Sequence, residues 1–85
     1  MTWGLVITKP AVRNLDEVPR ADVEHINAAF EEMRADPYGG DIKFLKGTKR
    51  TLRRRVGSWR ILFDVNADQR IVVILGVFRR SSNTY

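Results

Sequence analysis

The densest concentration of charge in the sequence is a basic segment at residues 43–60, KFLKGTKRTLRRRVGSWR. Eight of its eighteen residues are Lys or Arg, and none is Asp or Glu. Guanidinium groups match phosphate oxygens in a bidentate way, which a point-like ammonium does not. Leu52, Val56 and Trp59 are interleaved with the charges. We therefore predict a folded pair of strands that displays a phosphate-binding surface, not a solvated basic tail.

Alternation along a strand assigns the arginines of this segment to two faces. Arg53 and Arg55 share one face, whereas Arg54 shares the other with Leu52 and Val56. If helices cover the Leu52 face, Arg53 and Arg55 point away from them. Arg54 then occupies an apolar position. The pattern leaves open whether its side chain reaches the sheet edge or a bulge re-aims it.

Two further arginines lie close to this face in the expected sheet. Arg60 follows the Gly57-Ser58 turn, and Arg79 closes the last apolar run. We expect four arginines to converge on one patch: Arg53, Arg55, Arg60 and Arg79. Trp59 and Phe78 are aromatic neighbours on the same strands. Stacking on unpaired bases is one role for them, and core packing, which is commoner for strand aromatics, is the favoured one.

The elements that must position these residues follow from turn signals and periodicity. β-Branched and apolar runs predict strands, and an i, i+3, i+7 stripe of apolar residues predicts the longer helix. The expected strands are residues 3–8, 51–56, 59–65 and 70–79, with residues 44–47 either a short strand or irregular. The expected helices are residues 11–18 and a second one that begins at Pro19 and stops at Asp36-Pro37.

This order, β-α-α-β-β-β, predicts an α+β fold. We expect a single domain over residues 1–85, with a small antiparallel or mixed sheet of about four strands and two N-terminal helices packed on one face. Residues 1–42 carry a net charge of −4, from four Lys or Arg against eight Asp or Glu. Residues 43–85 carry +9, from eleven against two. This asymmetry indicates a polyanionic partner for one surface.

Composition excludes several classes of function. Cysteine is absent, so disulfides, thiolate metal sites and thiol nucleophiles are excluded, and a single histidine, His25, does not make a metal site. We expect no metal and no cofactor, and we interpret His25 as an exposed helix residue. No apolar run approaches the ~20 residues that span a bilayer, and nothing resembles a signal peptide. We expect a cytoplasmic protein without membrane contact.

Several segments resemble the RelE/ParE toxin superfamily of bacterial toxin–antitoxin systems. They are the Trp-initiated first strand, the Asp36-Pro37 helix stop, the LKG at residues 45–47, LRRRVGSWRILF at residues 52–63 and IVVILGVFRR at residues 71–80. Together they extend over nearly the whole chain. The resemblance implies a RelE-like fold and a cognate antitoxin protein as partner.

The RelE branch consists of endonucleases that cut mRNA in the ribosomal decoding site. Carried over to this chain, the resemblance implies a catalytic set: Arg53, Arg55, Arg60, Arg79 and Tyr85. Contacts to RNA and the ribosome are expected from the other basic residues of this half: Lys43, Lys46, Lys49, Arg50, Arg54 and Arg80. Positions that are often Lys in RelE proteins are Arg here, and Arg is not a general base.

Metal-free RNA cleavage needs a base for the 2′-OH, positive charge for the phosphorane oxygens and a proton source for the leaving 5′-oxygen. The arginines supply charge, so the role of base falls to Tyr85, favoured by nearby guanidinium groups. The alternative function is that of the ParE branch, whose members inhibit DNA gyrase by binding it without catalysis. A third possibility is a non-toxic nucleic-acid-binding module.

Overall fold

A computed structural model describes residues 2–80, and these form two helices and five strands. In chain order the elements are β1 (Gly4–Ile7), α1 (Lys9–Asp16), α2 (Arg20–Ala35), β2 (Ile42–Phe44), β3 (Thr51–Val56), β4 (Trp59–Asn66) and β5 (Ile71–Arg79). The predicted α+β class is confirmed, and the element boundaries, apart from those of β2, lie within about two residues of those expected. No helix in this part of the chain is long and apolar enough to cross a membrane.

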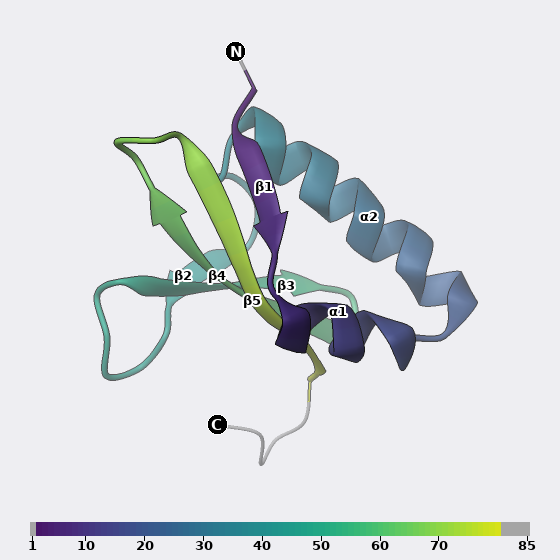
Figure 1. Ribbon diagram of the computed structural model, residues 1–85. Helices are drawn as coiled ribbons and strands as arrows, with labels where there is room; N and C mark the ends of the chain where they lie inside the picture. Colours follow the sequence, from purple (N-terminus) through teal and green to yellow (C-terminus); the bar gives the residue numbers. More distant parts are fainter. Residues whose placement is uncertain (1, 81–85) are drawn as a thin grey trace.

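The five strands form one mixed sheet in the order β1-β5-β4-β3-β2 (Figure 1). β1 is parallel to β5, and the other neighbours are antiparallel. The fifth strand, β2, lies earlier than the short strand considered at residues 44–47. The chain leaves the sheet after Phe44, and Gly47 with a φ of 87° turns it back towards β3.

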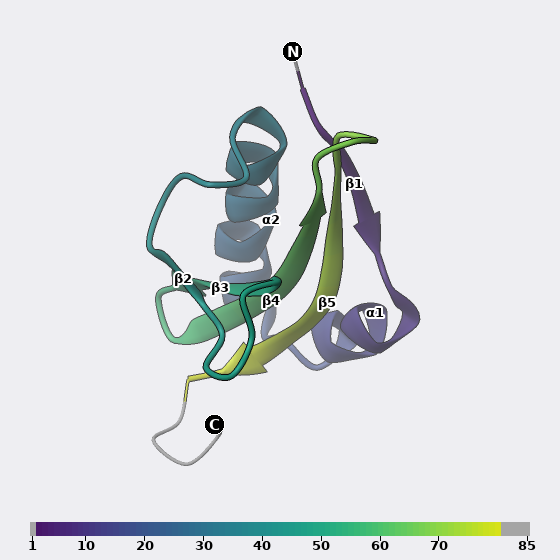
Figure 2. The ribbon, with the colours of Figure 1, turned by 90° about the vertical axis from the view of Figure 1, so that its left-hand side faces the viewer.

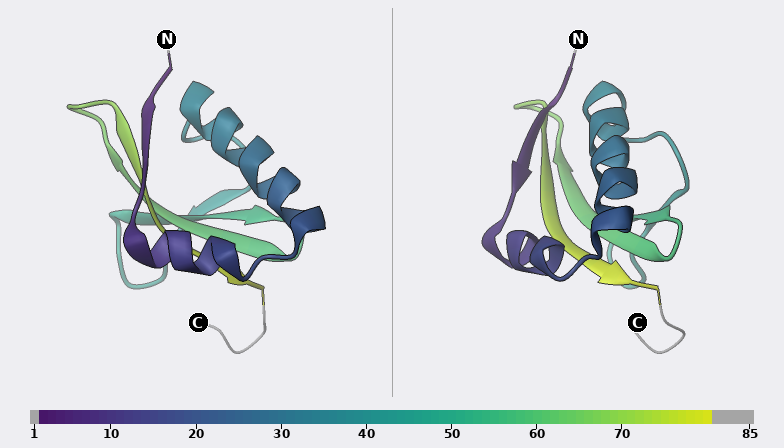
Figure 3. Two further views of the ribbon diagram at one scale, coloured as in Figure 1. Left: turned by 45° about the vertical axis from the view of Figure 1, so that its right-hand side comes forward. Right: turned by 90° about the vertical axis from the view of Figure 1, so that its right-hand side faces the viewer.

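α2 lies across one side of the sheet, whereas α1 lies at the edge of the sheet beside β5, and neither covers the opposite side, as Figures 2 and 3 show. α2 packs its apolar stripe, which includes Ile26, Phe30 and Met33, against the strands. α1 lies beside the second half of β5, past the point where β1 ends. There the Asn14 side-chain oxygen accepts a hydrogen bond from the Val77 backbone N–H at 3.0 Å, so α1 protects an otherwise open strand edge.

The strands alternate between this helix side and a side that neither helix covers. The helix side of β3, β4 and β5 supplies buried residues such as Leu52, Ile61 and Phe63. A bulge between β4 and β5 shifts the register, because Leu62 pairs with Gly76 whereas Phe63 pairs with Ile74. The side opposite the helices, which we call the open face, carries the arginines described next.

Candidate phosphate-binding site

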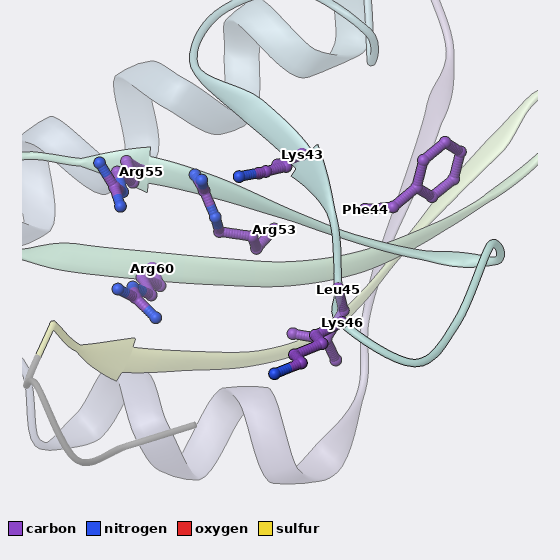
Figure 4. Close-up of a pocket in the computed structure, with 7 residues that line it drawn as sticks. All are labelled: Lys43, Phe44, Leu45, Lys46, Arg53, Arg55 and Arg60. Atoms are coloured by element: carbon purple, nitrogen blue, oxygen red, sulfur yellow. The ribbon is translucent and has the colours of Figure 1, made fainter.

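A cluster of cationic side chains occupies the open face of β2, β3 and β4. It surrounds a cavity of about 230 Å³, which we call the arginine cavity (Figure 4). The lining residues are Lys43, Phe44, Leu45, Lys46, Arg53, Arg55 and Arg60. Five of these seven are cations, so the cavity is suited to a polyanion.

The β3–β4 hairpin fixes the three arginines relative to one another. Arg55 and Arg60 are paired directly across the ladder, and Arg53 lies two residues before Arg55 on the same face. Gly57 allows the tight turn because it has a φ of 56°, in the left-handed region. Strand alternation and one short turn therefore bring three guanidinium groups to one place, as the sequence predicts for Arg53, Arg55 and Arg60.

Asp41, a residue that the sequence pattern did not single out, supports this hairpin from the loop before β2. Its carboxylate lies 3.6 Å from Arg53 Nη1, and its carbonyl accepts a hydrogen bond from the Arg55 backbone N–H at 3.0 Å. The Asp41 side chain is mostly exposed, whereas that of Arg53 is only 12% exposed. One carboxylate against five cations leaves the cavity strongly positive.

The arrangement suits phosphate chemistry. The buried Nε of Arg55 has no hydrogen-bond partner within residues 2–80, and a buried donor without a partner is costly unless a ligand or water satisfies it. Bidentate guanidinium contacts would bind phosphate oxygens and would stabilise the extra charge of a pentacoordinate phosphorane.

Arg79 does not join this cluster, so the prediction that four arginines converge is wrong for this one. Arg79 pairs with Trp59 at the end of β5, on the helix side of the sheet. Its guanidinium lies 4.5 Å from the centre of the Trp59 ring, and the Trp59 indole N–H donates to Asp22 at 3.0 Å. The physical reason is alternation: Arg79 is the strand neighbour of Phe78, which shares the open face with Arg60.

Arg54 also lies away from the cavity. The expectation that it contacts RNA is wrong, because its side chain is buried. Only 7% of the residue is exposed, on the helix side of β3. It forms an ion pair with Glu32 of α2 and donates to the Gly39 carbonyl at 3.3 Å. Arg54 adopts neither of the two conformations considered from the sequence. Its side chain stays on the helix side of β3, because Glu32 of α2 and the Gly39 carbonyl of the following loop bind it there.

The remaining predicted residues divide into three groups. Lys43 and Lys46 line the cavity. Lys49, Arg50 and Arg80 are exposed outside it; Arg50 is 3.5 Å from Asp64, and Arg80 donates to the Gly57 carbonyl. Tyr85 lies outside the described residues.

The favoured reading of Trp59 as a core residue is confirmed, because it is 7% exposed. Phe78 differs, since it lies partly buried on the open face as the pairing partner of Arg60. His25 is exposed on α2, as expected. This placement of Phe78 follows from strand alternation, because its neighbour in β5, Val77, is buried on the helix side.

Comparison with known proteins agrees with this fold. Residues 5–84 match the family described as the ParE toxin of the type II toxin–antitoxin system, parDE. A curated candidate toxin, RelE1 of Methanocaldococcus jannaschii, is 29% identical over 83 residues, which cover 94% of this chain and 92% of that protein.

Solved structures show the same similarity. The archaeal RelE–RelB complex of Pyrococcus horikoshii OT3 contains a chain with a TM-score of 0.82 and 25% identity, covering 96% of this chain and 99% of that one. The toxin–antitoxin complex RelBE2 of Mycobacterium tuberculosis gives a TM-score of 0.82 and 25% identity, with 94% and 100% covered.

The fold and these similarities define a toxin of a type II toxin–antitoxin system, in the RelE/ParE superfamily. Within that superfamily, the chain belongs to the ParE toxin family.

Proposed function

We propose that this toxin is an endoribonuclease that cleaves ribosome-bound mRNA without a metal ion and thereby inhibits translation. The observation that carries the proposal is the arginine cavity, where Arg53, Arg55 and Arg60 gather on a face that neither helix covers. The RelE names of the similar proteins support the same activity.

The proposed reaction uses the RNA's own 2′-OH. The 2′-oxygen attacks the adjacent phosphorus, the bond from phosphorus to the 5′-oxygen breaks, and the products are a 2′,3′-cyclic phosphate and a 5′-hydroxyl end. The arginines stabilise the charge that develops on the phosphorane oxygens. A base removes the 2′-OH proton and an acid protonates the 5′-oxygen. Tyr85 stays the proposed base.

The proposed partner is a cognate antitoxin, because the similar chains of Pyrococcus horikoshii and Mycobacterium tuberculosis were solved as complexes with their antitoxins. An acidic segment of that antitoxin is complementary to the five cations of the arginine cavity. Neutralisation of the toxin would then follow from occupancy of the site that binds RNA phosphates.

The second candidate function is inhibition of DNA gyrase, and the description of the matching family as ParE favours it. In that case the arginines would form a protein-binding surface, since Arg is enriched at binding hot spots. The two functions make different predictions for mRNA: the endoribonuclease cuts it, whereas the gyrase inhibitor leaves it intact.

The deciding experiment is primer extension on message in a reconstituted translation system with programmed ribosomes. Wild type is compared with Tyr85→Phe and Arg60→Gln, and with Arg20→Gln as a control for an exposed arginine on α2. We expect new 5′ ends within the ribosome-occupied codon for wild type and the control, and at least a ~100-fold loss for the two site variants. Intact message with wild type, together with loss of gyrase supercoiling, would establish the second candidate instead.

A further inference from the structure

A second cavity lies between the C-terminal end of α1 and the last residues of β5. It has a volume of about 290 Å³, and we call it the α1–β5 cavity. Its lining residues are Asn14, Glu17, Trp59, Val77, Phe78 and Arg79. None of them lines the arginine cavity, so the two cavities are separate surfaces of the same sheet.

Phe78 lies between the two cavities: it lines the α1–β5 cavity and is next to Arg60, which lines the arginine cavity. It is the direct pairing partner of Arg60 across the β4–β5 ladder, and paired residues in such a ladder are about 4.5–5.5 Å apart. The ring lies over Gly76, because a Cβ atom on Gly76 would be 2.5 Å from Phe78 Cε2. An aromatic ring therefore lies next to an arginine of the proposed phosphate site. Proteins that bind single-stranded nucleic acids combine the same two features, a cationic surface for phosphates and an aromatic side chain for a base.

The polar groups of the α1–β5 cavity are of both signs. Arg79 is held over the Trp59 ring, which leaves the edge of its guanidinium as a donor. Glu17 is exposed and forms no ion pair within the part of the chain that the structure describes. A carboxylate repels a bare phosphate, so the cavity is unsuited to an anion. A ligand with acceptors, donors and a flat apolar face fits better.

We propose that the α1–β5 cavity binds one unpaired guanine base of the RNA whose phosphates occupy the arginine cavity. Guanine presents O6 and N7 as acceptors, the preferred partners of arginine, and N1–H and N2–H as donors suited to the Glu17 carboxylate. Its flat face stacks on Phe78. The inference rests on the proposed function, since it requires RNA in the arginine cavity.

The test measures binding and not cleavage. Short fluorescent 2′-O-methyl oligouridines cannot be cut, because the 2′-oxygen is blocked. One internal residue is guanine, hypoxanthine (which lacks the N2 amine), adenine or abasic, and affinity is measured by anisotropy at fixed salt. For wild type we expect guanine to bind about 5- to 150-fold more tightly than the abasic residue and about tenfold more tightly than adenine.

Two variants and one control assign the effect to residues. Glu17→Gln should reduce the preference for guanine over hypoxanthine and adenine about fivefold or more, with the abasic affinity unchanged. Glu24→Gln, which removes the same charge from an exposed position on α2, should leave the preference intact. Phe78→Leu keeps an apolar side chain, and it should lower the affinity for every oligonucleotide except the abasic one.

The outcomes also separate this inference from the proposed function. Equal affinity for all four oligonucleotides, or equal preferences in Glu17→Gln and Glu24→Gln, would overturn the base site. Cleavage of ribosome-bound message would still stand in that case. A guanine preference that depends on Glu17 in a protein that leaves message intact would support the base site and refute the nuclease.

Discussion

Arg55 and Arg60 lie directly opposite each other in the β3–β4 ladder, with their side chains on the same open face. Like charges at paired positions destabilise a sheet. The pairing therefore lowers the stability of the hairpin, but it holds two guanidinium groups where one phosphate can bridge them.

The first prediction concerns this cost. Arg55→Thr removes one of the two charges and places a good strand former in β3, so we expect the free energy of unfolding to rise by about 0.2–1 kcal/mol. Urea unfolding at low salt measures it. Inorganic phosphate should raise the Tm of wild type more than that of the variant, because it binds only the folded arginine cavity. A variant less stable than wild type would contradict the prediction.

The second prediction concerns the salt dependence of RNA binding. Each phosphate contact to single-stranded nucleic acid contributes about −0.7 to the slope of log affinity against log salt. With Arg53, Arg55 and Arg60 in contact, we expect a slope near −2 from these three. Arg60→Gln should make the slope shallower by about 0.7, whereas Arg54→Met should leave it unchanged. An equal change of slope in both variants would show that Arg54 contacts RNA despite its burial.

The third prediction concerns the ion pair that connects β3 to α2. Glu32→Ala leaves the buried guanidinium of Arg54 without its carboxylate. We expect a loss of about 1–2 kcal/mol in the free energy of unfolding, less than for a fully buried pair because Glu32 is 67% exposed. Glu31→Ala, at an exposed neighbouring position, should change stability by less than about 0.5 kcal/mol. Equal losses in the two variants would show that the ion pair contributes nothing.

The fourth prediction uses two glycines with similar backbone conformations. Gly40 and Gly57 have φ of 78° and 56°, so Ala at either costs about 1–2 kcal/mol. At Gly57 no atom lies within 4 Å of the new Cβ, but at Gly40 Arg54 Cζ would be 2.7 Å away. We expect Gly40→Ala to cost about 1 kcal/mol more, and this difference should vanish in an Arg54→Met background. Unfolding of wild type, Gly40→Ala, Arg54→Met and the variant that combines both substitutions forms a double-mutant cycle, and Gly57→Ala measured in both backgrounds is the control.

The fifth prediction concerns the ring of Phe78. Gly76→Ala would place a methyl group 2.5 Å from Phe78 Cε2 and 3.2 Å from Asn14 Oδ1. We expect the ring to be displaced, with a loss of about 1–3 kcal/mol in stability. Gly4→Ala, where the nearest atom lies 3.5 Å from the new Cβ, is the matched control on β1. A loss of stability no larger than in the control would show that the Phe78 ring can keep its position when residue 76 has a Cβ atom.

Much of this molecule was determined by local sequence. The apolar stripe that includes Ile26, Phe30 and Met33 specifies α2, and Asp36-Pro37 ends it, because proline restricts the residue before it. The Gly57-Ser58 turn and the alternation of β3 and β4 place Arg53, Arg55 and Arg60 on one face. These features depend on residues close together in the chain, so a single sequence is sufficient to predict them.

Tertiary structure decided the rest. The burial of Arg54 depends on Glu32, twenty-two residues away, and the strand pattern alone allowed two other conformations. The separation of Arg79 from the other arginines depends on its pairing with Trp59, and the bulge in β5 is a feature of strand pairing. Which side chains meet across strands and helices is set by register and packing between distant segments, and no local pattern contains that information.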